Sequence, residues 1–279
     1  MNLAFIGLGS MGASQAALLA QGDHELTVYD IDSAACAAFE NSANVADSVA
    51  TATKGADLIH VCVRDRVQTE AVLFGDTGVL NSAKSDALIL LHSTLEVAAV
   101  QAAKEAASKA GVRLADVPVT RTRQESTAPF VMSMFGGSTE DFQTALPSLQ
   151  IFSTDVLHVG DTGSAMALKI ANNMMTWAQL VIGDITHRLA KSHDITWEHL
   201  ATVTKANGNL TPTTEAFLSG AQLPREQRSS SHLAFIESQL GIGEKDLSLA
   251  IAAGQNAAID MTVITELRSA LRSAMLGAN

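Results

Sequence analysis

The amino-acid sequence predicts an α/β protein with an N-terminal doubly wound parallel sheet and an all-α C-terminal domain. Short apolar runs alternate with helical stretches from Leu3 to Asp116, which is typical of a parallel sheet covered by helices on both faces. Strand patterns disappear after Gly163, where five helical stretches remain. We therefore expect two domains, residues 1–162 and residues 163–279.

The elements of the first domain are predicted from short apolar runs bounded by glycine, proline and polar residues. Strands are expected at residues 3–6, 25–29, 58–63, 87–91, 112–116 and 132–135, with edge strands at 151–152 and 156–159. Helices are expected at 13–20, 33–39, 68–73, 97–110 and 140–146, the last of them ended by Pro147. Because the strands are parallel, ligands should bind at their carboxyl ends.

The second domain is predicted to contain helices only. They are expected at residues 164–191, 196–205, 233–239, 246–256 and 261–275, with loops at 207–209 and 224–231. The first of these helices is longer than an average helix, and we expect it to connect the two domains.

The composition of the chain excludes several classes of protein. The formal net charge of −11 argues against nucleic-acid binding, which needs a basic surface. No apolar run is long and uncharged enough to cross a membrane, and the N-terminus lacks the basic residues of a signal peptide. Cys36 and Cys62 do not have metal-binding spacing, so we expect no metal site and a reducing, cytoplasmic location.

A glycine-rich turn follows the first predicted strand directly and reads Gly7-Leu8-Gly9-Ser10-Met11-Gly12. Its G-x-G-x-x-G spacing allows the backbone to approach a pyrophosphate at the N-terminus of the next helix. Asp30 ends the second strand near the spacing of an acid that hydrogen-bonds the ribose of an adenosine. We therefore predict a Rossmann-type site for NAD, preferred over NADP because Asp30 would repel a 2′-phosphate. The alternative is a structural glycine turn in a flavodoxin-like sheet.

One face of the long helix carries polar side chains among alanines and methionines. Lys169, Asn172 and Asn173 are three and four residues apart and share this face, which Thr176 extends by a turn. Burial would disfavour the charged form of the lysine, so that its amine could transfer a proton at neutral pH. The alternative is a lysine that snorkels to solvent beside two satisfied amides.

Three further polar segments lie at the ends of predicted elements. Thr120-Arg121-Thr122-Arg123 follows the strand at 112–116, where arginine suits a carboxylate, sulfonate or phosphate, although a solvated turn is the alternative. Ser93-Thr94 follows the strand at 87–91 and could instead cap the next helix. Lys245-Asp246 precedes a helical run, for which Asp246 is a candidate N-cap.

Taken in order, these segments resemble the β-hydroxyacid dehydrogenases, the family of 3-hydroxyisobutyrate dehydrogenase and of short relatives of 6-phosphogluconate dehydrogenase. The resemblance covers nearly the whole chain and implies a Rossmann domain, a helical domain and a homodimer or homotetramer. It rests on the glycine motif, Ser93-Thr94, Asp116-Val117-Pro118-Val119, Gly136-Gly137, Gly160-x-x-Gly163 leading to Lys169-x-x-Asn172-Asn173, and Lys245-Asp246-Leu247-x-Leu249-Ala250.

The resemblance also implies roles for individual residues. Lys169 matches the catalytic lysine of the family, which acts as general acid and base, and Asn173 matches a residue that helps to hold the substrate. We assign Asn172 and Thr176 to the substrate as well. Positions that contact or line the cofactor in the family are matched here by Val63, Arg64, Gln68, Thr94 and Lys245.

The segment after Pro118-Val119 departs from the usual Ser-Gly-Gly of the family, because it reads Thr120-Arg121-Thr122 here. It is similar to the sulfolactaldehyde reductase branch, in which an arginine grips the sulfonate. We therefore expect Thr120, Arg121 and Thr122 to bind the acid group of a small anionic substrate, with Arg123 as a further basic group. The segment before Lys245 and the C-terminus also depart from the family.

The activity implied is hydride transfer between NAD(H) and a small 3-hydroxyacid or its semialdehyde, of the 3-hydroxyisobutyrate, 4-hydroxybutyrate or sulfolactaldehyde type. Imine reductases share the architecture, but they lack this lysine. A decarboxylating 6-phosphogluconate enzyme needs a longer helical domain than the residues after Gly163 provide. A non-catalytic NAD-binding sensor is the alternative from a different class of protein.

Overall fold

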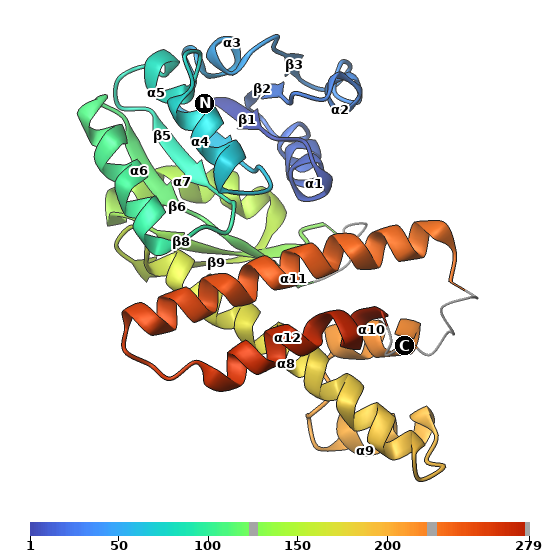
Figure 1. The fold of residues 1–279 in the computed structure, drawn as a ribbon. Coiled ribbons are helices and arrows are strands. Elements are labelled where there is room, and N and C mark those ends of the chain that lie inside the picture. Colours follow the sequence, from blue (N-terminus) through green and yellow to red (C-terminus); the bar gives the residue numbers. More distant parts are fainter. Residues whose placement is uncertain (123–127, 222–227, 277–279) are drawn as a thin grey trace. The chain divides into compact units, whose positions relative to one another are not determined.

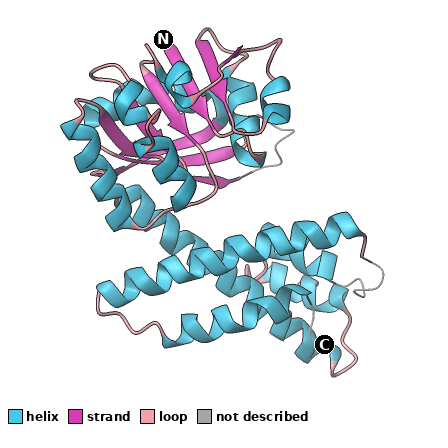
Figure 2. Cartoon of the chain, turned by 45° about the horizontal axis from the view of Figure 1, so that its top comes forward, coloured by secondary structure: helices cyan, strands magenta, loops and turns pink. Residues whose placement is uncertain are grey.

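The computed structural model describes residues 1–122, 128–221 and 228–276. The chain forms two compact units, Met1–Lys169 and Ile170–Asn279. All the described strands belong to the first unit, and the described part of the second unit is built from helices and their connections (Figures 1 and 2). The expected fold class, a doubly wound α/β sheet followed by a helical region, is confirmed.

The described strands of the first unit form one sheet in the order β3-β2-β1-β4-β5-β6-β8-β7, and β9 pairs with β8. The strands from β1 to β6 pair in parallel, whereas β8 is antiparallel to β6 and β7. The parallel part therefore has the 3-2-1-4-5-6 order of a dinucleotide-binding sheet. The strands are β1 Asn2–Ile6, β2 Glu25–Tyr29, β3 Asn44–Val45, β4 Leu58–Val61, β5 Leu88–Leu91, β6 Arg113–Asp116, β7 Val119–Arg121, β8 Val131–Gly136 and β9 Ser153–Gly160.

The two central strands, β4 and β5, are buried along their whole length. Their sequences, Leu-Ile-His-Val and Leu-Ile-Leu-Leu, are nearly continuous in apolar residues, because a parallel strand covered on both faces has no solvent side. Phe5 of β1 and Phe152 at the end of α7 are fully buried in the same hydrophobic core. This rigid centre supports the loops at the carboxyl ends of the strands.

Side chains cap most helices of the first unit. Asp32, Ser48, Asp65 and Ser138 each accept a hydrogen bond from the first turn of the helix that they precede. The helices are α1 Ser10–Leu19, α2 Ser33–Ala37, α3 Val49–Thr53, α4 Arg66–Phe74, α5 Val79–Ser82, α6 Val97–Lys109 and α7 Thr139–Phe152.

The second unit packs around its own hydrophobic core. Trp177, Leu180 and Val181 of the long helix contribute one side of this core, and Leu240, Leu247 and Leu271 are among the residues opposite. The long helix begins in the last residues of the first unit and continues into the second. The helices are α8 Ser164–Lys191, α9 Trp197–Ala206, α10 Pro212–Ala221, α11 Ser230–Asn256 and α12 Thr262–Leu276. No described helix has an apolar stretch long enough to cross a membrane.

Two predicted boundaries differ most from the structure, and the elements β3, α3, α5 and α10 were not predicted. Pro147 does not end its helix, since α7 continues to Phe152, where an edge strand was expected. Pro147 and Gln143 are both exposed, so the carbonyl that loses its helical hydrogen bond can bind water. Ala145, Leu149 and Phe152 are buried at helical spacing. We infer that their packing outweighs the local cost of the proline.

The second error concerns α11, which is one continuous helix where two helices with a break before Asp246 were expected. Gly241 and Gly243 lie between the two expected helices. In the structure a Cβ on Gly243 would lie 2.8 Å from Leu271 and 3.0 Å from the Trp177 ring, so this glycine allows close packing rather than ending a helix. Asp246 therefore lies inside α11 and is not an N-cap. Residues 224–227 of the predicted loop at 224–231 lie outside the described residues, and α11 includes its last two residues.

Candidate cofactor and substrate sites

The glycine turn after β1 has a backbone geometry that leaves no room for a Cβ at Gly7 or Gly12. Gly7 has a φ of 98°, and a Cβ there would lie 2.4 Å from Cys62 O. A Cβ on Gly12 would lie 2.1 Å from Gly7 O. Gly9 is the N-cap of α1 and offers no side-chain cap, and a Cβ there would meet no atom within 4 Å. The first N–H groups of α1 are thus left for a pyrophosphate, so these residues fit a dinucleotide.

Asp30, directly after β2, is tied to this turn. Its Oδ2 accepts a hydrogen bond from Leu8 N at 2.6 Å, and its Oδ1 accepts one from Asp32 N at 2.9 Å. The backbone N–H of Asp30 also donates to Cys36 Sγ at 3.2 Å. Asp30 is therefore fixed beside the glycine turn, where a carboxylate can reach the ribose of a bound adenosine.

The carboxyl ends of β4 and β5 are joined by Ser93. Its Oγ donates to Val63 O at 2.6 Å and accepts from Val63 N at 3.1 Å. Gln68 Oε1 accepts from Arg64 N at 2.9 Å, which closes the next turn. The N-cap of α6 is Glu96, so Ser93 and Thr94 do not cap this helix. Thr94 is half-buried directly after Ser93.

His92, beside Ser93, belongs to the core rather than to a ligand site. Its Nδ1 lies 2.8 Å from Val117 O, and a carbonyl only accepts, so Nδ1 carries the proton. His92 Nε2 then accepts from His60 Nδ1 at 3.0 Å. Burial lowers the pKa of His92 to about 4, partly opposed by its hydrogen bond to Val117. Burial, with the neighbouring charge of His92, lowers the pKa of His60 well below its usual value.

The predicted substrate segment forms part of a strand. Thr120 and Arg121 belong to β7 and pair with Met132 and Val131 of β8, where the sequence indicated a loop. Arg121 is exposed. The hydroxyl of Thr122 lies 3.2 Å from Phe130 O and 3.2 Å from Thr154 Oγ1. Arg123 lies outside the described residues.

The N-terminus of α8 is held by a buried carboxylate, Asp116, at the end of β6. Its two oxygens accept hydrogen bonds from Gly163 N and Met166 N, each at 2.6 Å. Asp116 is fully buried, and this burial raises its pKa although both hydrogen bonds oppose the shift. A Cβ on Gly136 would lie 2.4 Å from Asp116 Oδ1, so this glycine makes room for the carboxylate. Lys169 follows Met166 by one turn and is 9% exposed.

The next turns of α8 carry the predicted substrate amides. Asn173 Nδ2 donates to Asp246 Oδ2 at 2.7 Å, and Asn172 Nδ2 donates to Asn173 Oδ1 at 3.3 Å. Thr176 Oγ1 donates to Asn172 O at 3.2 Å along the helix. Asn172 is exposed and Asn173 is half-buried. The three side chains thus stay on one helical face, as their spacing predicted.

Asp246 of α11 contacts α8 through Asn173 and Trp177, and Lys245 lies beside it in the sequence. Asp246 is 2% exposed, and its Oδ2 also accepts a hydrogen bond from Trp177 Nε1 at 3.1 Å. Lys245 Nζ lies 3.4 Å from Asp246 Oδ1. The structure therefore brings Lys245 together with Asn173 through one buried carboxylate.

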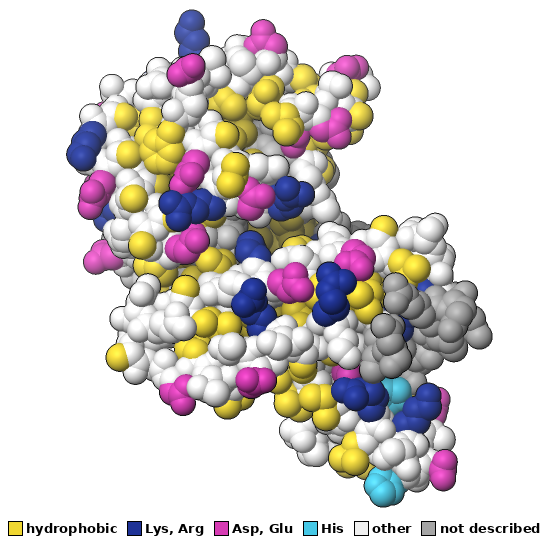
Figure 3. Space-filling model, viewed as in Figure 1, with side chains coloured by type: hydrophobic (Ala, Val, Ile, Leu, Met, Phe, Trp, Pro, Cys, Tyr) yellow, Lys and Arg dark blue, Asp and Glu magenta, His cyan; other side chains and the backbone are white. Residues whose placement is uncertain are grey.

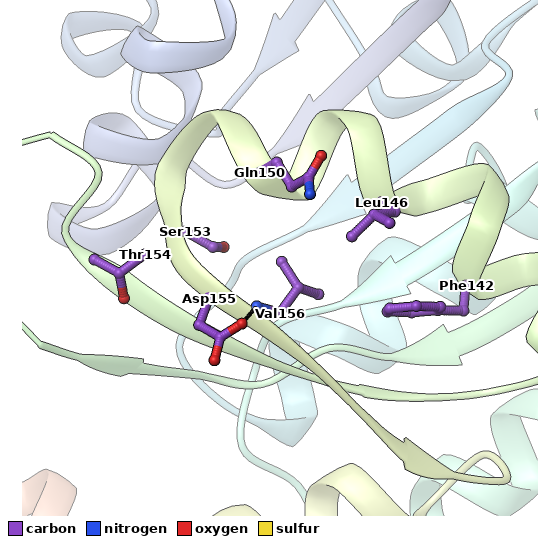
Figure 4. Close-up of a pocket in the computed structure, with 7 residues that line it drawn as sticks. All are labelled: Phe142, Leu146, Gln150, Ser153, Thr154, Asp155 and Val156. Carbon is purple, nitrogen blue, oxygen red and sulfur yellow. Dashed lines mark hydrogen bonds between the residues drawn. The ribbon is translucent and has the colours of Figure 1, made fainter.

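A surface hollow of about 440 Å³ lies between α7 and β9 (Figure 4). None of the predicted site residues lines it, and its lining has no basic side chain. Among its lining residues, Thr154 contacts the predicted substrate segment, because its hydroxyl lies 3.2 Å from that of Thr122. We conclude that this hollow does not suit an anionic substrate. It is lined by Phe142, Leu146, Gln150, Ser153, Thr154, Asp155 and Val156.

Charged side chains of both signs are mixed on the face shown in Figure 3, without a continuous basic surface. In the described part of the chain, no three His, Cys, Asp or Glu side chains come together as a group that could hold a metal ion. The sites described above offer a glycine turn, amides, the two lysines Lys169 and Lys245, Arg121 and buried carboxylates.

The glycine turn at the carboxyl end of β1, in a sheet of order 3-2-1-4-5-6, defines a Rossmann dinucleotide-binding protein. The sequence family described as the NAD binding domain of 6-phosphogluconate dehydrogenase matches residues 2–160, more than half of the chain. The chain therefore belongs to this family of NAD-dependent β-hydroxyacid dehydrogenases, and residues 2–160 are its NAD-binding domain. The predicted resemblance and the predicted cofactor class are confirmed.

Relatives with curated descriptions are oxidoreductases. An uncharacterized oxidoreductase of Mycobacterium tuberculosis is 28% identical over 261 residues, which cover 93% of this chain and 88% of that protein. A 3-hydroxyisobutyrate dehydrogenase of Pseudomonas aeruginosa is 31% identical over 62% of this chain and 59% of its own length. A 3-sulfolactaldehyde reductase of Escherichia coli is 30% identical over 63% of this chain and 59% of its own length.

Solved structures share the fold of the whole chain. The 3-hydroxyisobutyrate dehydrogenase of M. tuberculosis, solved with L-serine, has a TM-score of 0.81 at 22% identity and covers 98% of this chain and 92% of its own. An imine reductase of Myxococcus stipitatus, solved as a variant with NAD⁺, has a TM-score of 0.66 at 21% identity over 99% of this chain and 94% of its own. These identities indicate a common fold only.

Three residues of these sites were not recognised from the sequence. Asp116 was noted as part of a motif, but its hydrogen bonds to Gly163 and Met166 join segments that are far apart in the chain. Trp177 and Asp246 meet across two helices in the same way. A carboxylate in an otherwise apolar helical face is the signal that could have indicated Asp246 as a buried group.

Proposed function

We propose that the protein is an NAD(H)-dependent oxidoreductase that transfers hydride between the nicotinamide and a small 3-hydroxyacid or its semialdehyde. The observation that carries the proposal is the largely buried Lys169, one turn after a helix N-terminus fixed by Asp116. The membership of the family and the names of the relatives from P. aeruginosa and E. coli support it.

In this proposal Lys169 is the general acid and base. It takes the proton of the substrate hydroxyl in oxidation and returns a proton to the carbonyl oxygen in reduction. Asn172, Asn173 and Thr176 hold the substrate. Bound NAD supplies the hydride acceptor or donor. The residues assigned to hold it are Gly7, Leu8, Gly9, Ser10, Met11, Gly12, Asp30, Val63, Arg64, Gln68, Thr94 and Lys245.

The substrate is expected to be a small anion whose acid group binds Thr120, Arg121 and Thr122. Because the net charge of −11 repels anions, binding needs a local cation, and the exposed Arg121 supports this assignment. The backbone N–H of Thr122 donates to Phe130 O at 2.9 Å and its hydroxyl lies 3.2 Å from the same oxygen, so Thr122 must exchange one of these contacts to bind the anion. We propose a carboxylate or sulfonate as the anion, which an arginine binds in a bidentate manner.

The test measures absorbance at the NADH band with a panel of substrates. The panel contains 3-hydroxyisobutyrate, 4-hydroxybutyrate, glycerate, L-serine, tartronate semialdehyde, dihydroxypropanesulfonate and sulfolactaldehyde. Lys169→Ala should lower kcat at least about 100-fold while NADH still binds, because general acid–base catalysis contributes about 10²–10⁴-fold. Lys191→Ala, an exposed lysine at the other end of the same helix, is the matched control and should leave kcat unchanged. Full turnover by Lys169→Ala would remove the assignment.

Two alternatives remain as outcomes of this panel. Amine products from an imine substrate would assign the protein to the imine reductases, whose fold it shares. NADH binding without turnover of any substrate would favour a non-catalytic NAD-binding sensor. We also propose that the protein is cytoplasmic and that it forms a homodimer or homotetramer. The exposed apolar face of α8 supports the homo-oligomer.

A further inference from the structure

We propose that Asp246 is a positioning residue for the substrate, that it acts by fixing the side-chain amide of Asn173, and that Trp177 fixes Asp246 in turn. The three side chains share one carboxylate oxygen: Asp246 Oδ2 accepts from Asn173 Nδ2 at 2.7 Å and from Trp177 Nε1 at 3.1 Å. The inference rests on the proposed function, because that function assigns Asn173 to the substrate.

The carboxylate determines which way the amide of Asn173 faces. An ionised carboxylate has no hydrogen to donate, so the nitrogen and not the oxygen of the amide must lie against Asp246. The oxygen of the amide then accepts from Asn172 Nδ2 at 3.3 Å. One N–H of Asn173 is left without a hydrogen bond among the described residues. This N–H is a donor of fixed position for the substrate.

Burial makes this arrangement rigid. Asp246 is 2% exposed and Trp177 is 8% exposed, so neither side chain can turn to solvent. A Cβ on Gly243 would lie 3.0 Å from the Trp177 ring, and this close approach of α11 holds the indole beside Asp246. Lys245 Nζ, 3.4 Å from Asp246 Oδ1, balances the charge of the carboxylate.

A donor that is already fixed needs no reorganisation when the substrate binds, which is the advantage of a preorganised site. Removing Asp246 would leave the amide free to rotate about χ2, and both the half-buried Asn173 Nδ2 and the buried Trp177 Nε1 would lose their acceptor. The expected loss is therefore mainly in substrate binding and orientation, whereas NADH binding should change less, through Lys245, which loses its partner Asp246.

The experiment is a double-mutant cycle on Asn173 and Asp246, read as kcat/KM for the acid substrate. Asn173→Ala should lower kcat/KM about 10- to 100-fold, the range for a hydrogen bond to a charged group. Asp246→Leu should lose at least about tenfold, mainly through a higher KM for the acid, with the KM for NADH within about twofold of wild type. The double variant should equal Asn173→Ala alone. Losses that multiply would overturn the proposal.

Two further variants separate positioning from general loosening of the helices. Trp177→Phe removes the other donor to the same oxygen but keeps the Asn173 hydrogen bond, so kcat/KM should fall by about fivefold, less than in Asp246→Leu. Asp246→Asn keeps one acceptor oxygen and should stay within about fivefold. A loss in either variant as large as that of Asp246→Leu would mean that packing, and not the position of Asn173, sets the activity.

A second readout does not depend on turnover. The side-chain amide of Asn173 can be identified in an NMR spectrum by its loss in Asn173→Ala, and its hydrogen that is bonded to Asp246 should exchange slowly in the wild type and in Asp246→Asn. Exchange as fast as that of a solvent-exposed amide would overturn the proposal even if Asp246→Leu does not fold. If the wild type turns over no acid, the proposed function fails, and slow exchange still tests the Asn173–Asp246 contact.

Discussion

Asp30 has two roles that a single carboxylate can fill at once. In the structure it accepts hydrogen bonds from Leu8 N and Asp32 N, so it fixes the glycine turn without a bound nucleotide. Its charge also disfavours a 2′-phosphate on an adenosine ribose placed beside it. The same residue is therefore expected to determine both the shape of the turn and the choice between NAD and NADP.

We predict that Asp30→Ala lowers the ratio of kcat/KM for NADH to that for NADPH by at least about tenfold, or about 1.4 kcal/mol. The KM for both cofactors should rise, because Leu8 N loses its acceptor. Asp32→Ala is the control: its carboxylate accepts from Ala34 N at 2.9 Å, at the start of α2, and it has no hydrogen bond to the glycine turn. A wild-type protein that prefers NADPH would contradict the assignment of Asp30.

Individual residues were predictable where their role is local. The glycines of residues 7–12 and the face shared by Lys169 and Asn173 follow from spacing alone. Asp116 and Asp246 were not assigned, because their partners lie 47 and 69 residues or more away. Hydrogen bonds between distant segments depend on the packing of whole elements, which a single sequence does not contain.

At the scale of single elements, β4 and β5 carry a pair of buried histidines. The rings of Phe5, His60 and His92 are nearly parallel, and the His60 centroid lies 5.3 Å from that of Phe5 and 5.2 Å from that of His92. His60 Nε2 is buried without a hydrogen-bond partner among the described residues. A proton on this nitrogen would be a charge in an apolar core, so the folded protein keeps the pair neutral.

We predict that the free energy of unfolding falls as the pH falls from about 6.5 to about 4. A histidine whose pKa is lower in the folded state contributes stability above its unfolded pKa and loses it on acidification. For His92, with a pKa of about 4, the loss by pH 4 is about 3 kcal/mol.

Urea unfolding at several pH values measures this slope. His60→Phe/His92→Phe keeps two flat rings in the stack and should lack the histidine part of the pH dependence, although it is less stable at neutral pH because Val117 O loses its donor. An unchanged slope in the double variant would assign the acid sensitivity to other groups.

Most elements were predictable in type because hydrophobic periodicity is strong in the core strands and in α6, α8 and α12. Boundaries failed where packing outweighed local preference, at Pro147 in α7 and at Gly243 in α11. The strand β7 was read as a loop, since its three residues gain strand geometry only by pairing with β8. These errors have one cause, which is the contribution of partners distant in sequence.

At the scale of the whole molecule, α8 presents a second apolar face opposite its buried one. Met175, Ile182, Ile185 and Leu189 are 43 to 62% exposed. Together with Ala171 and Ala178 they follow alternating spacings of four and three residues, the heptad pattern of a helix–helix seam. The only charged side chain between Ile170 and His187 is the buried Asp184.

This face supports the proposed homo-oligomer. A second copy of the chain carries the same seam, so two α8 helices related by a two-fold axis can pack against each other. In a chain with a net charge of −11, an uncharged apolar surface is where self-association meets the least repulsion. An apolar hollow of about 550 Å³, which Met175, Ala178 and Ile182 help to line, adds to this surface.

We predict that Ile182→Glu shifts the protein to monomers, because each copy would bury a charge in the seam. Sedimentation equilibrium measures the change. Val263→Glu is the matched control, since Val263 is 71% exposed on α12 and lies outside the seam. A monomeric wild type, or an oligomer that Ile182→Glu leaves intact, would contradict this interface.

The hydrogen bonds of Asp116 also have a consequence for the synthesis of the chain. The matched NAD-binding family ends at residue 160, but the buried carboxylate of Asp116 depends on N–H groups at Gly163 and Met166. As the ribosome extends the chain, this charge has no partner in the core until the first turn of α8 has left the exit tunnel. We therefore expect the core around Asp116 to become stable only when the helix that carries Lys169 has begun to form.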